Sequence, residues 1–551
     1  MNLKKYKNAV LFIPLGGAGE IGMNLNVYIC NERILIVDIG IGFADERFPG
    51  IDIIIPDISF LREYRENIDG VVLTHAHEDH IGGCPYILDE LCAPVYTTKF
   101  TAAVLRAKLR EHGMDKEISI NEVEKNSSFM IGEEFEIEMV HITHSVPENN
   151  GVLIKTRAGN IFHTGDWKFD EMPAFGSASN YDRLISIGKD GVLAMVCDST
   201  NIFEEDEVRS ESLLRDSLIN IISSINEGLI AVTTFASNIA RLISIYEAAK
   251  KANRQVVLIG RALWRMYNAA KEVGFLDESS KFLDIEEAGD FQKQNLLIVC
   301  TGCQGEPLAA TNKLANDEFK NISLTSGDTA IFSSKIIPGN EKRIFALFNK
   351  FCDKGVKVIT EKNNFVHLSG HPSKREVKEM YGMIKPKIAI PVHGEAIHIA
   401  EHANIAEKLG CEYSFKVKNG DVVLLNEEPY KLGRVQSGYS LIDGNSILGE
   451  NSAVIKERKK MMFSGVIFVS LFIIKGSAVY TIDAPGLFDE EVNKDVLKMV
   501  KNRVNQIILE AGSSLKNKVK SVERSIISSL KKLVKNELGK QPLIICSSKM
   551  M

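Results

Sequence analysis

A short loop that crowds histidine and carboxylate residues behind an apolar strand constrains this chain more than any other part of its sequence. The loop is THAHEDH, residues 74–80. Three imidazoles and two acids make little sense in an apolar core, because buried polar groups need partners. In an extended segment, His75 and His77 project to one side, while Asp79 and His80 can reach a neighbouring point. Imidazole and carboxylate together suit zinc, with manganese as an alternative. The loop predicts a metal site with room for two centres.

The same arrangement, an apolar strand that ends in a polar loop, recurs along the chain. Strand ends of this kind carry His144, Asp166, Asp198, His371 and His393. Polar residues gathered repeatedly at strand ends indicate one site along one edge of a sheet. We therefore take His144, Asp166 and His393 as the candidates for the remaining metal ligands.

These strand ends lie on both sides of a region of alternating strands and helices, which predicts a metal-type domain interrupted by an inserted α/β domain. The length of 551 residues allows about three or four domains. With 45% hydrophobic and 25% charged residues, a disordered or fibrous chain is excluded. We expect the first part of the metal-type domain over 1–204, the inserted domain over 205–355 and the second part of the metal-type domain over 356–430. A linker over 431–454 and a C-terminal domain over 455–551 follow.

A glycine-rich segment near the N-terminus imitates a dinucleotide-binding motif. Residues 17–22 match GxGxxG, and Asp38 follows at the distance of a ribose-binding acid. The motif requires a helix after the last glycine. Residues 24–30 alternate with a period of two, as a strand does, and only a short turn separates them from Ile34. We interpret the glycines as a tight turn that lets the backbone approach a site.

Two other groups have metal-like spacing but favour ordinary structural roles. His398 and His402 lie four residues apart on a predicted helix, where we expect a solvated surface. Cys300 and Cys303 form a CxxC without a second pair, which is more typical of small buried side chains.

The cysteines and the apolar runs indicate the compartment. Nine cysteines, an odd number, are scattered along the chain and form no disulfide framework, so we expect a reducing cytoplasm. The longest uncharged run, residues 461–474, is too short to span a bilayer. We expect no membrane association.

The successive motifs resemble those of β-CASP nucleases on the metallo-β-lactamase fold. The resemblance rests on HAHEDH with the following IGG, THS at 143–145, HTGD at 163–166, DSTN at 198–201, SGH at 369–371 and PVHGE at 391–395. Further motifs make the chain similar to the ribonuclease J family, and they are residues 16–22, FASN at 235–238, TGCQGEP at 301–307 and PGNE at 338–341. The resemblance implies an αββα sandwich interrupted by an inserted β-CASP domain, followed by a small C-terminal α/β domain.

The resemblance also implies the ligand sets. His75, His77 and His144 would hold one metal, Asp79, His80 and His393 the other, and Asp166 would bridge them. Two zinc ions per chain are expected, with manganese or magnesium as alternatives.

Further residues acquire roles through the same resemblance. His371 would be the general acid at the leaving oxygen, and Asp198 would orient a ligand or the attacking water. The loop Ser369-Gly370-His371 would cradle an RNA phosphate. Ser237 and Asn238, at the start of a predicted helix, would contact a 5′-phosphate, although such residues are more often simple helix caps.

The implied activity is metal-dependent hydrolysis of RNA, both 5′-to-3′ trimming from monophosphorylated ends and internal cutting, in RNA maturation and mRNA decay. Relatives associate through the C-terminal domain, so a homodimer or homotetramer is expected. Two alternatives remain: a small-molecule metallohydrolase on the same fold, and an inactive RNA-binding scaffold. The inserted domain opposes the first, and the complete set of ligand residues opposes the second.

The charge distribution bears on the RNA partner. A net charge of -6 is at first sight unfavourable for nucleic acid. Residues 491–551, however, contain 13 Lys plus Arg against 5 Asp plus Glu. A basic C-terminal face could bind RNA, and binding should then weaken with salt.

Overall fold

The computed structural model describes residues 1–114, 118–205, 210–276, 280–474, 477–489, 491–512 and 518–550. The chain forms two compact units. The first comprises Met1–Gly42 with Ile55–Gly438, and the second comprises Phe43–Ile54 with Tyr439–Met551. Each unit has its own hydrophobic core.

The first unit contains an eight-stranded sheet with the order β24-β23-β1-β3-β4-β7-β8-β9. Its strands, in that order, are Tyr430–Arg434, Asp421–Leu425, Val10–Gly16, Leu25–Cys30, Arg33–Val37, Ile68–Val72, Val95–Thr97 and Ile120–Glu122. The predicted hairpins are present, because β3 pairs antiparallel with both β1 and β4. Asn31 and Glu32 have positive φ between β3 and β4, as a two-residue hairpin turn requires.

A seven-stranded sheet lies against the first, with the order β10-β11-β12-β13-β14-β20-β22. Its strands are Ser128–Ile131, Phe135–His141, Asn150–Thr156, Gly159–His163, Ala194–Asp198, Ile388–Val392 and Tyr413–Ser414. Buried residues of both sheets form one core between them, among them Phe12, Val72, Ile137 and Val196.

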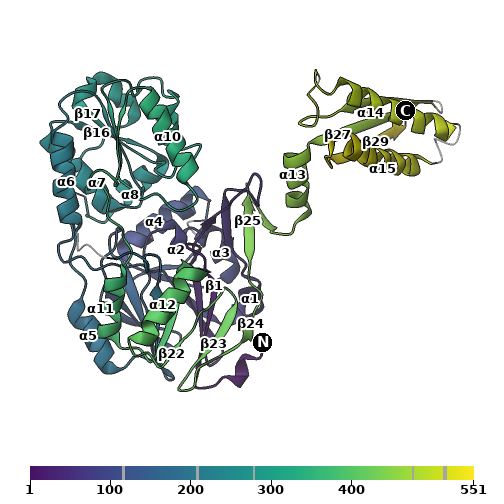
Figure 1. Cartoon of the computed structure of the whole chain (residues 1–551). Helices are drawn as coiled ribbons and strands as arrows, with labels where there is room; N and C mark the ends of the chain where they lie inside the picture. Colours follow the sequence, from purple (N-terminus) through teal and green to yellow (C-terminus); the bar gives the residue numbers. More distant parts are fainter. Residues whose placement is uncertain are drawn as a thin grey trace. The chain divides into compact units, whose positions relative to one another are not determined.

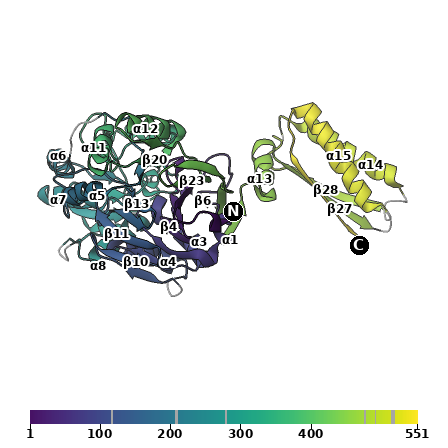
Figure 2. The same ribbon diagram turned by 90° about the horizontal axis from the view of Figure 1, so that it is seen from below.

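Helices cover the outer faces of the two sheets, so four layers form an αββα sandwich. Figure 2 shows α11 and α12 on one side of the strands and α3 and α4 on the other. The helices of the sandwich are α1 (Ser59–Glu63), α2 (Glu78–Ile81), α3 (Cys84–Leu91), α4 (Lys99–Glu111), α5 (Tyr181–Asp190), α11 (Lys374–Ile384) and α12 (Ala396–Lys408).

The glycine-rich segment forms no dinucleotide-binding unit. The short strand β2 (Ala18–Gly19) pairs in parallel with β21 (Gly394–Glu395), and the chain then enters β3 with no helix between. No helix N-terminus is available there for a pyrophosphate. The pairing brings the glycine-rich turn next to His393, whose N–H donates to the carbonyl of Gly17.

The insertion is a separate layer structure around a five-stranded parallel sheet with the order β16-β17-β15-β18-β19. Its strands are Gln255–Ile259, Leu296–Cys300, Ile230–Thr233, Thr329–Phe332 and Lys357–Ile359. Its helices are α6 (Glu211–Ser223), α7 (Ile239–Lys251), α8 (Arg261–Glu272), α9 (Ala310–Ala315) and α10 (Glu341–Asp353), several of which surround the sheet in Figure 1. The chain order reverses on either side of the central strand β15, where open parallel sheets bind ligands.

The second unit ends in a three-stranded sheet covered by two helices. The sheet has the order β28-β27-β29, formed by Ser477–Asp483, Val466–Ile474 and Leu543–Met550. Figure 2 shows α14 (Lys494–Ala511) and α15 (Val519–Leu538) along one side of it. Helix α13 (Ala453–Ser464) precedes this layer.

The interval 431–454, which the sequence predicts as a linker, contains regular strands. It contains most of β24, then β25 (Tyr439–Asp443) and β26 (Ser446–Gly449), which join β5 (Gly42–Phe43) and β6 (Ile53–Pro56) in a four-stranded sheet. Most side chains of β24 and β26 are exposed, so these strands lack the apolar alternation by which strands are recognised.

Among the described residues, none of the helices has both the length and the apolar character that a membrane crossing requires.

Candidate metal centre

The structure brings the predicted ligands and the predicted catalytic residues together where strands of both sheets end. The loop after β7 leads into α2 and carries four of them, and each of the others follows or ends a different strand or precedes a helix. The residues are His75, His77, Asp79 and His80 in the loop, His144 after β11, Asp166 after β13, Asp198 at the end of β14, His371 before α11 and His393 after β20. One edge of the sandwich thus collects residues from distant parts of the chain.

The first cluster contains His75, His77, His144 and Asp166, whose ligand atoms all lie within 4.8 Å of one another. Nδ1 of His77 lies 3.0 Å from Nε2 of His75 and 3.0 Å from Nε2 of His144. Burial lowers the pKa of His77 to about 4, and it holds the pKa of His75 and of His144 well below the ordinary value. Three neutral imidazoles therefore turn ring nitrogens toward one point, which is the form that binds a metal.

The second cluster contains Asp79, His80, Asp166 and His393, again within 4.8 Å. Oδ2 of Asp166 lies 3.2 Å from Nε2 of His80 and 3.9 Å from Nε2 of His75, so one oxygen faces both clusters. This buried oxygen and the buried Nε2 of His393 make no well-directed hydrogen bond to the described residues, although Nε2 of His393 lies 3.3 Å from Oδ2 of Asp79. Buried polar atoms of native proteins are nearly always satisfied. The donor set therefore fits bound metal ions.

His371 and Asp198 form a third group around Asp166. Nδ1 of His371 lies 2.8 Å from Oδ2 of Asp198 and 3.8 Å from Oδ2 of Asp166. Burial alone would lower the pKa of His371, but the two carboxylates outweigh burial and raise it. Thr200 donates its N–H and its hydroxyl to the other oxygen of Asp198. The imidazole is thus held beside the metal ligands in a form that can donate a proton.

Asp38, which the sequence suggested only as part of a dinucleotide pattern, orients a metal ligand. Its Oδ2 lies 2.7 Å from Nδ1 of His80, and its Oδ1 accepts the N–H of Thr74 at 2.8 Å. Thr74 in turn lies 2.9 Å from Nδ1 of His75 through its hydroxyl. Carboxylates that bind the far nitrogen of a ligand histidine fix its ring and its tautomer. The sequence signal for this role is the position of Asp38 directly after β4, the strand that pairs with β7.

The loop Ser369-Gly370-His371 packs directly on the first cluster. The carbonyl of Gly370 lies 2.6 Å from Nδ1 of His144, and a Cβ at position 370 would approach Cε1 of that ring to 2.7 Å. Only glycine fits there without displacing the ligand. The amide of Asn201 donates to the Ser369 hydroxyl at 2.7 Å and to the His371 carbonyl at 3.2 Å. Asn201, which the sequence did not single out in a role of its own, therefore fixes both ends of this loop.

The start of α7 is tied to the same loop through a buried arginine. Asn238 caps the helix by accepting the N–H of Arg241, and Ser237 precedes it. The Arg241 side chain is fully buried, pairs with Glu211 at 2.8 Å, and donates to the Leu368 carbonyl at 3.5 Å. The helix start thus lies beside the chain that enters the His371 loop.

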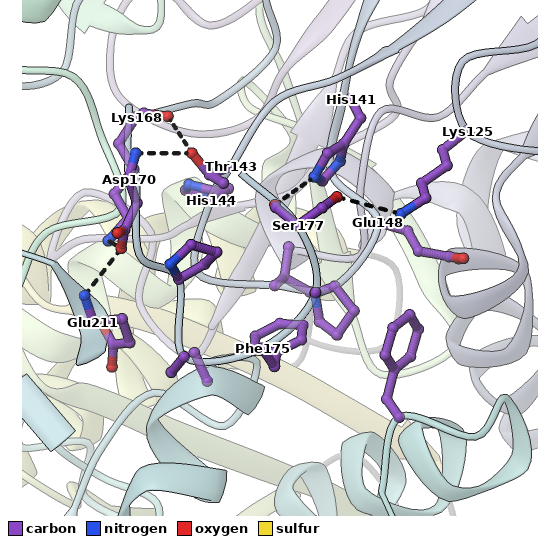
Figure 3. A pocket seen from close by; sticks show the side chains of 17 residues that line it. Lys125, His141, Thr143, His144, Glu148, Lys168, Asp170, Phe175, Ser177 and Glu211 are labelled. Carbon is purple, nitrogen blue, oxygen red and sulfur yellow. Dashed lines mark hydrogen bonds and ion pairs between the residues drawn. The ribbon is translucent and has the colours of Figure 1, made fainter. Parts of the chain in front are cut away.

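A narrow pocket lies beside His144, lined by residues of the sandwich and of the inserted domain. Figure 3 shows Ser177 between His141 and Lys125, which it contacts through its carbonyl and its hydroxyl. At the other side of the pocket, Asp170 accepts the N–H of Glu211 at 2.9 Å. Lys168 lies 3.2 Å from the same carboxylate. The contact between Asp170 and Glu211 joins the sandwich to the inserted domain behind the metal ligands.

A second joint involves the metal loop itself. Glu78, between His77 and Asp79, points away from the ligands and contacts Nζ of Lys108 at 2.6 Å and Nη2 of Arg265 at 3.3 Å. Lys108 belongs to α4 and is buried, and Arg265 belongs to α8 of the insertion, where it also pairs with Glu111 at 2.8 Å. We call Glu78, Lys108, Arg265 and Glu111 the charge clasp. It connects the inserted domain to the loop that carries four ligands.

The prediction for one of the two groups with metal-like spacing is wrong. His402 is not part of a solvated surface but is fully buried, with its ring nitrogens 2.9 Å from the Ser199 hydroxyl and 3.1 Å from the Tyr381 hydroxyl. It supports the chain behind Asp198 rather than binding metal. The CxxC cysteines are buried as expected, and burial raises the pKa of Cys300 to about 11 and that of Cys303 to about 12.

Family models match most of the chain. They are the beta-lactamase superfamily domain over residues 49–184, the ribonuclease J beta-CASP domain over 227–351, the Zn-dependent metallo-hydrolase RNA specificity domain over 355–418 and the ribonuclease J C-terminal domain over 453–548. The match thus extends over the sandwich, the insertion and the C-terminal unit.

Relatives from several bacteria support the same assignment. Ribonuclease J of Sinorhizobium meliloti is 39% identical over 84% of this chain and 83% of its own length. Ribonuclease J of Helicobacter pylori is 33% identical over 99% of this chain and 80% of its own length, and ribonuclease J2 of Bacillus subtilis is 32% identical over 98% and 99%. A crystal structure of a protein of unknown function from Enterococcus faecalis, 16% identical, covers 76% of this chain and all of its own with a TM-score of 0.53, which shows the shared fold.

Proposed function

Because the chain belongs to the ribonuclease J family and is a metal-dependent ribonuclease, we propose that it trims RNA from 5′-monophosphate ends in the 5′-to-3′ direction and also cuts internally. The observation that carries the proposal is the position of Oδ2 of Asp166, which faces both ligand clusters, 3.2 Å from Nε2 of His80 and 3.9 Å from Nε2 of His75. Such activity would serve RNA maturation and mRNA decay. The nine cysteines are all free, which supports a cytoplasmic location.

The two ligand clusters are proposed to hold two zinc ions, with manganese or magnesium as alternatives. His75, His77 and His144 would bind one ion, Asp79, His80 and His393 the other, and Asp166 both. When bound, such cations would supply an activated water and would neutralise the charge that develops on the phosphate.

The residues around the clusters would handle the leaving group. His371 donates Nδ1–H to Asp198, which leaves Nε2 free to give a proton to the leaving oxygen. Asp198 keeps that ring in position and would orient a ligand or the attacking water, and the Thr200 hydroxyl donates a hydrogen bond that holds its other oxygen. Asp79 contributes to catalysis as a ligand.

The RNA backbone would be held by two neighbouring segments. Ser369, Gly370 and His371 would bind a phosphate at the cut, and Asn201 keeps them in place. Ser237 and Asn238, at the start of α7 after the central strand β15, would contact the 5′-phosphate. The link through Arg241 supports a common phosphate path.

Assembly into a homodimer or homotetramer is proposed to involve the C-terminal unit. The side chains of β27 alternate, and the face away from the helices exposes Phe468 (39%), Ile474 (44%), Val479 (61%) and Ile545 (40%). An apolar sheet face of this kind favours association with a second copy. Light scattering of Phe468→Ser with Val479→Ser should show smaller particles than the wild-type chain.

The test of the activity uses RNA with a 5′-monophosphate or a 5′-triphosphate and supplied zinc, manganese or magnesium. Wild-type protein should degrade the monophosphorylated RNA faster, and Asp79→Ala with His80→Ala should abolish cleavage. Asp89→Ala with His112→Ala, both exposed and outside the clusters, is the matched control. If the wild type cleaves no RNA, the alternative is an inactive RNA-binding scaffold. If it cleaves a thioester or lactam substrate instead, the alternative is a small-molecule hydrolase.

A further inference from the structure

The two helices of the C-terminal unit bury one side and expose the other. Val500 and Val504 of α14, and Ile526 and Leu530 of α15, belong to the core against the sheet. The exposed sides carry basic residues, which are Lys494, Lys498 and Lys501 on α14 and Lys520, Arg524, Lys531, Lys532 and Lys535 on α15. Among the described residues, none of them pairs with a carboxylate within 4.0 Å. The layer therefore presents uncompensated positive charge.

Four of these cations form a row. Lys520, Arg524, Lys531 and Lys535 are spaced by four, seven and four residues, which places them on one face of an α-helix. We call these four residues the α15 row. At 1.5 Å per residue it extends over about 22 Å, so it can follow a linear polyanion.

The acidic residues of α15 do not neutralise the row. Glu523 is half-buried and accepts a hydrogen bond from the hydroxyl of Ser548 on β29, so it faces the sheet. Glu537 lies in the last turn, beyond the row. None of the large apolar residues described in α15 is strongly exposed, whereas a helix that lies in a membrane surface needs an exposed apolar face.

We propose that the α15 row binds the phosphate backbone of RNA at a point outside the catalytic centre, so that long RNA is held by two contacts. This rests on the proposed ribonuclease function. A row of flexible cations without an apolar or hydrogen-bonding pocket recognises regularly spaced phosphates rather than a base sequence. Its contribution should therefore depend on RNA length and salt, and not on sequence.

The variant Lys520→Gln, Arg524→Gln, Lys531→Gln, Lys535→Gln in the full chain tests this, because glutamine keeps the helix propensity. The matched control removes the same charge from the amino-terminal edge of the inserted sheet, with Lys250→Gln, Lys251→Gln, Lys271→Gln and Lys357→Gln, all exposed. Binding and cleavage are measured with RNA of about 6 and about 40 nucleotides, over a range of potassium chloride concentrations.

For the row variant, KM for the long RNA should rise about tenfold and the slope of log affinity against log salt should fall by up to about 3, since each phosphate contact contributes about 0.7. Short RNA, kcat and the particle size should stay at wild-type values, and so should every value of the control. Equal affinity of wild type and variant for long RNA would overturn the proposal. An equal loss of affinity for short RNA would also overturn it. So would an acidic peptide of the same charge that lowers the affinity of the wild type for long RNA by the same amount without binding to the row.

The binding measurement keeps this proposal separate from the proposed function. If the wild type binds long RNA through the row but cleaves neither RNA, the ribonuclease function fails and the binding surface stands. If a smaller change is needed to preserve folding, Lys531→Gln with Lys535→Gln should give about half the change in slope.

Discussion

The metal centre and the α15 row both gather charged groups that can bind a ligand, yet they hold these groups in opposite ways. At the centre the groups are buried, and Asp166 is only 1% exposed. On α15 the cations stand in solvent on separate turns. Buried ligands that converge on one point select a particular ion there, because desolvation makes other arrangements costly. An exposed row acts at longer range and is screened by salt. Changes at the centre should alter the chemistry, and changes on the row should alter only the binding of long RNA.

The largest effect is expected for Asp166→Asn. The substitution preserves shape but removes the charge of the oxygen that faces both clusters, so neither metal set is complete. Cleavage of short RNA should fall by about 10⁴-fold, equivalent to about 5 kcal/mol in the barrier. Single-turnover rates with saturating metal measure it, with Asp89→Asn as the control. An equal loss of affinity for long RNA would contradict the separation of the two regions.

His371→Ala should lower kcat by about 10²- to 10⁴-fold, the range of a lost general acid. His371 contacts Asp198 and lies outside both ligand sets, so metal content should stay unchanged. Rates together with metal analysis by mass spectrometry check both parts. Loss of metal from this variant would show that His371 is a ligand and not a proton donor.

Asp38→Asn is expected to act on the metal rather than on the reaction. It removes the carboxylate that holds Nδ1 of His80, and such orienting partners are worth about 10- to 100-fold in metal affinity. Competition with a chelator should reveal weaker binding, while kcat at saturating metal stays close to the wild-type value. Asp52→Asn, an exposed aspartate of the other unit, is the control. Unchanged metal affinity would show that Asp38 has only a structural role.

Asp38 also shows what a local motif can and cannot tell. The loop at 74–80 predicted the centre because its chemistry is contiguous and has no structural alternative. The strand-end residues His144, Asp166 and His393 followed from a repeated local pattern. Asp38, by contrast, is one acid at the end of a strand, and only the pairing of β4 with β7 brings it beside His80. Its spacing from the glycines was a coincidence that the hairpin already excluded.

Other features depend on contacts that no local pattern encodes. His402 has the spacing of a surface helix residue, and its burial comes from α11 and from the chain after Asp198. The strands within 431–454 are exposed, so they lack an apolar period. The charge clasp joins Glu78 to Arg265 across 187 residues of sequence. Residue types predict chemistry where it is concentrated, and the fold decides which isolated residues serve it.

The smallest effect is expected at the charge clasp, and it refines the contrast between buried and exposed charge. Arg265→Ala removes the link from α8 to Glu78 but leaves Lys108 paired with Glu78, so the metal loop keeps its buried partner. The unfolding free energy should fall by about 1 kcal/mol or less, the range of a partly exposed ion pair, and KM should rise a few-fold for short and long RNA alike. Glu111→Gln, which removes only the outer contact of Arg265, is the control and should change less. Because the Arg265 side chain is only 14% exposed, the rise in KM should persist at high salt, whereas the effect of the α15 row should vanish there. A clasp effect confined to long RNA, or one abolished by salt, would place Arg265 among the exposed phosphate contacts and not at the joint between the inserted domain and the metal loop.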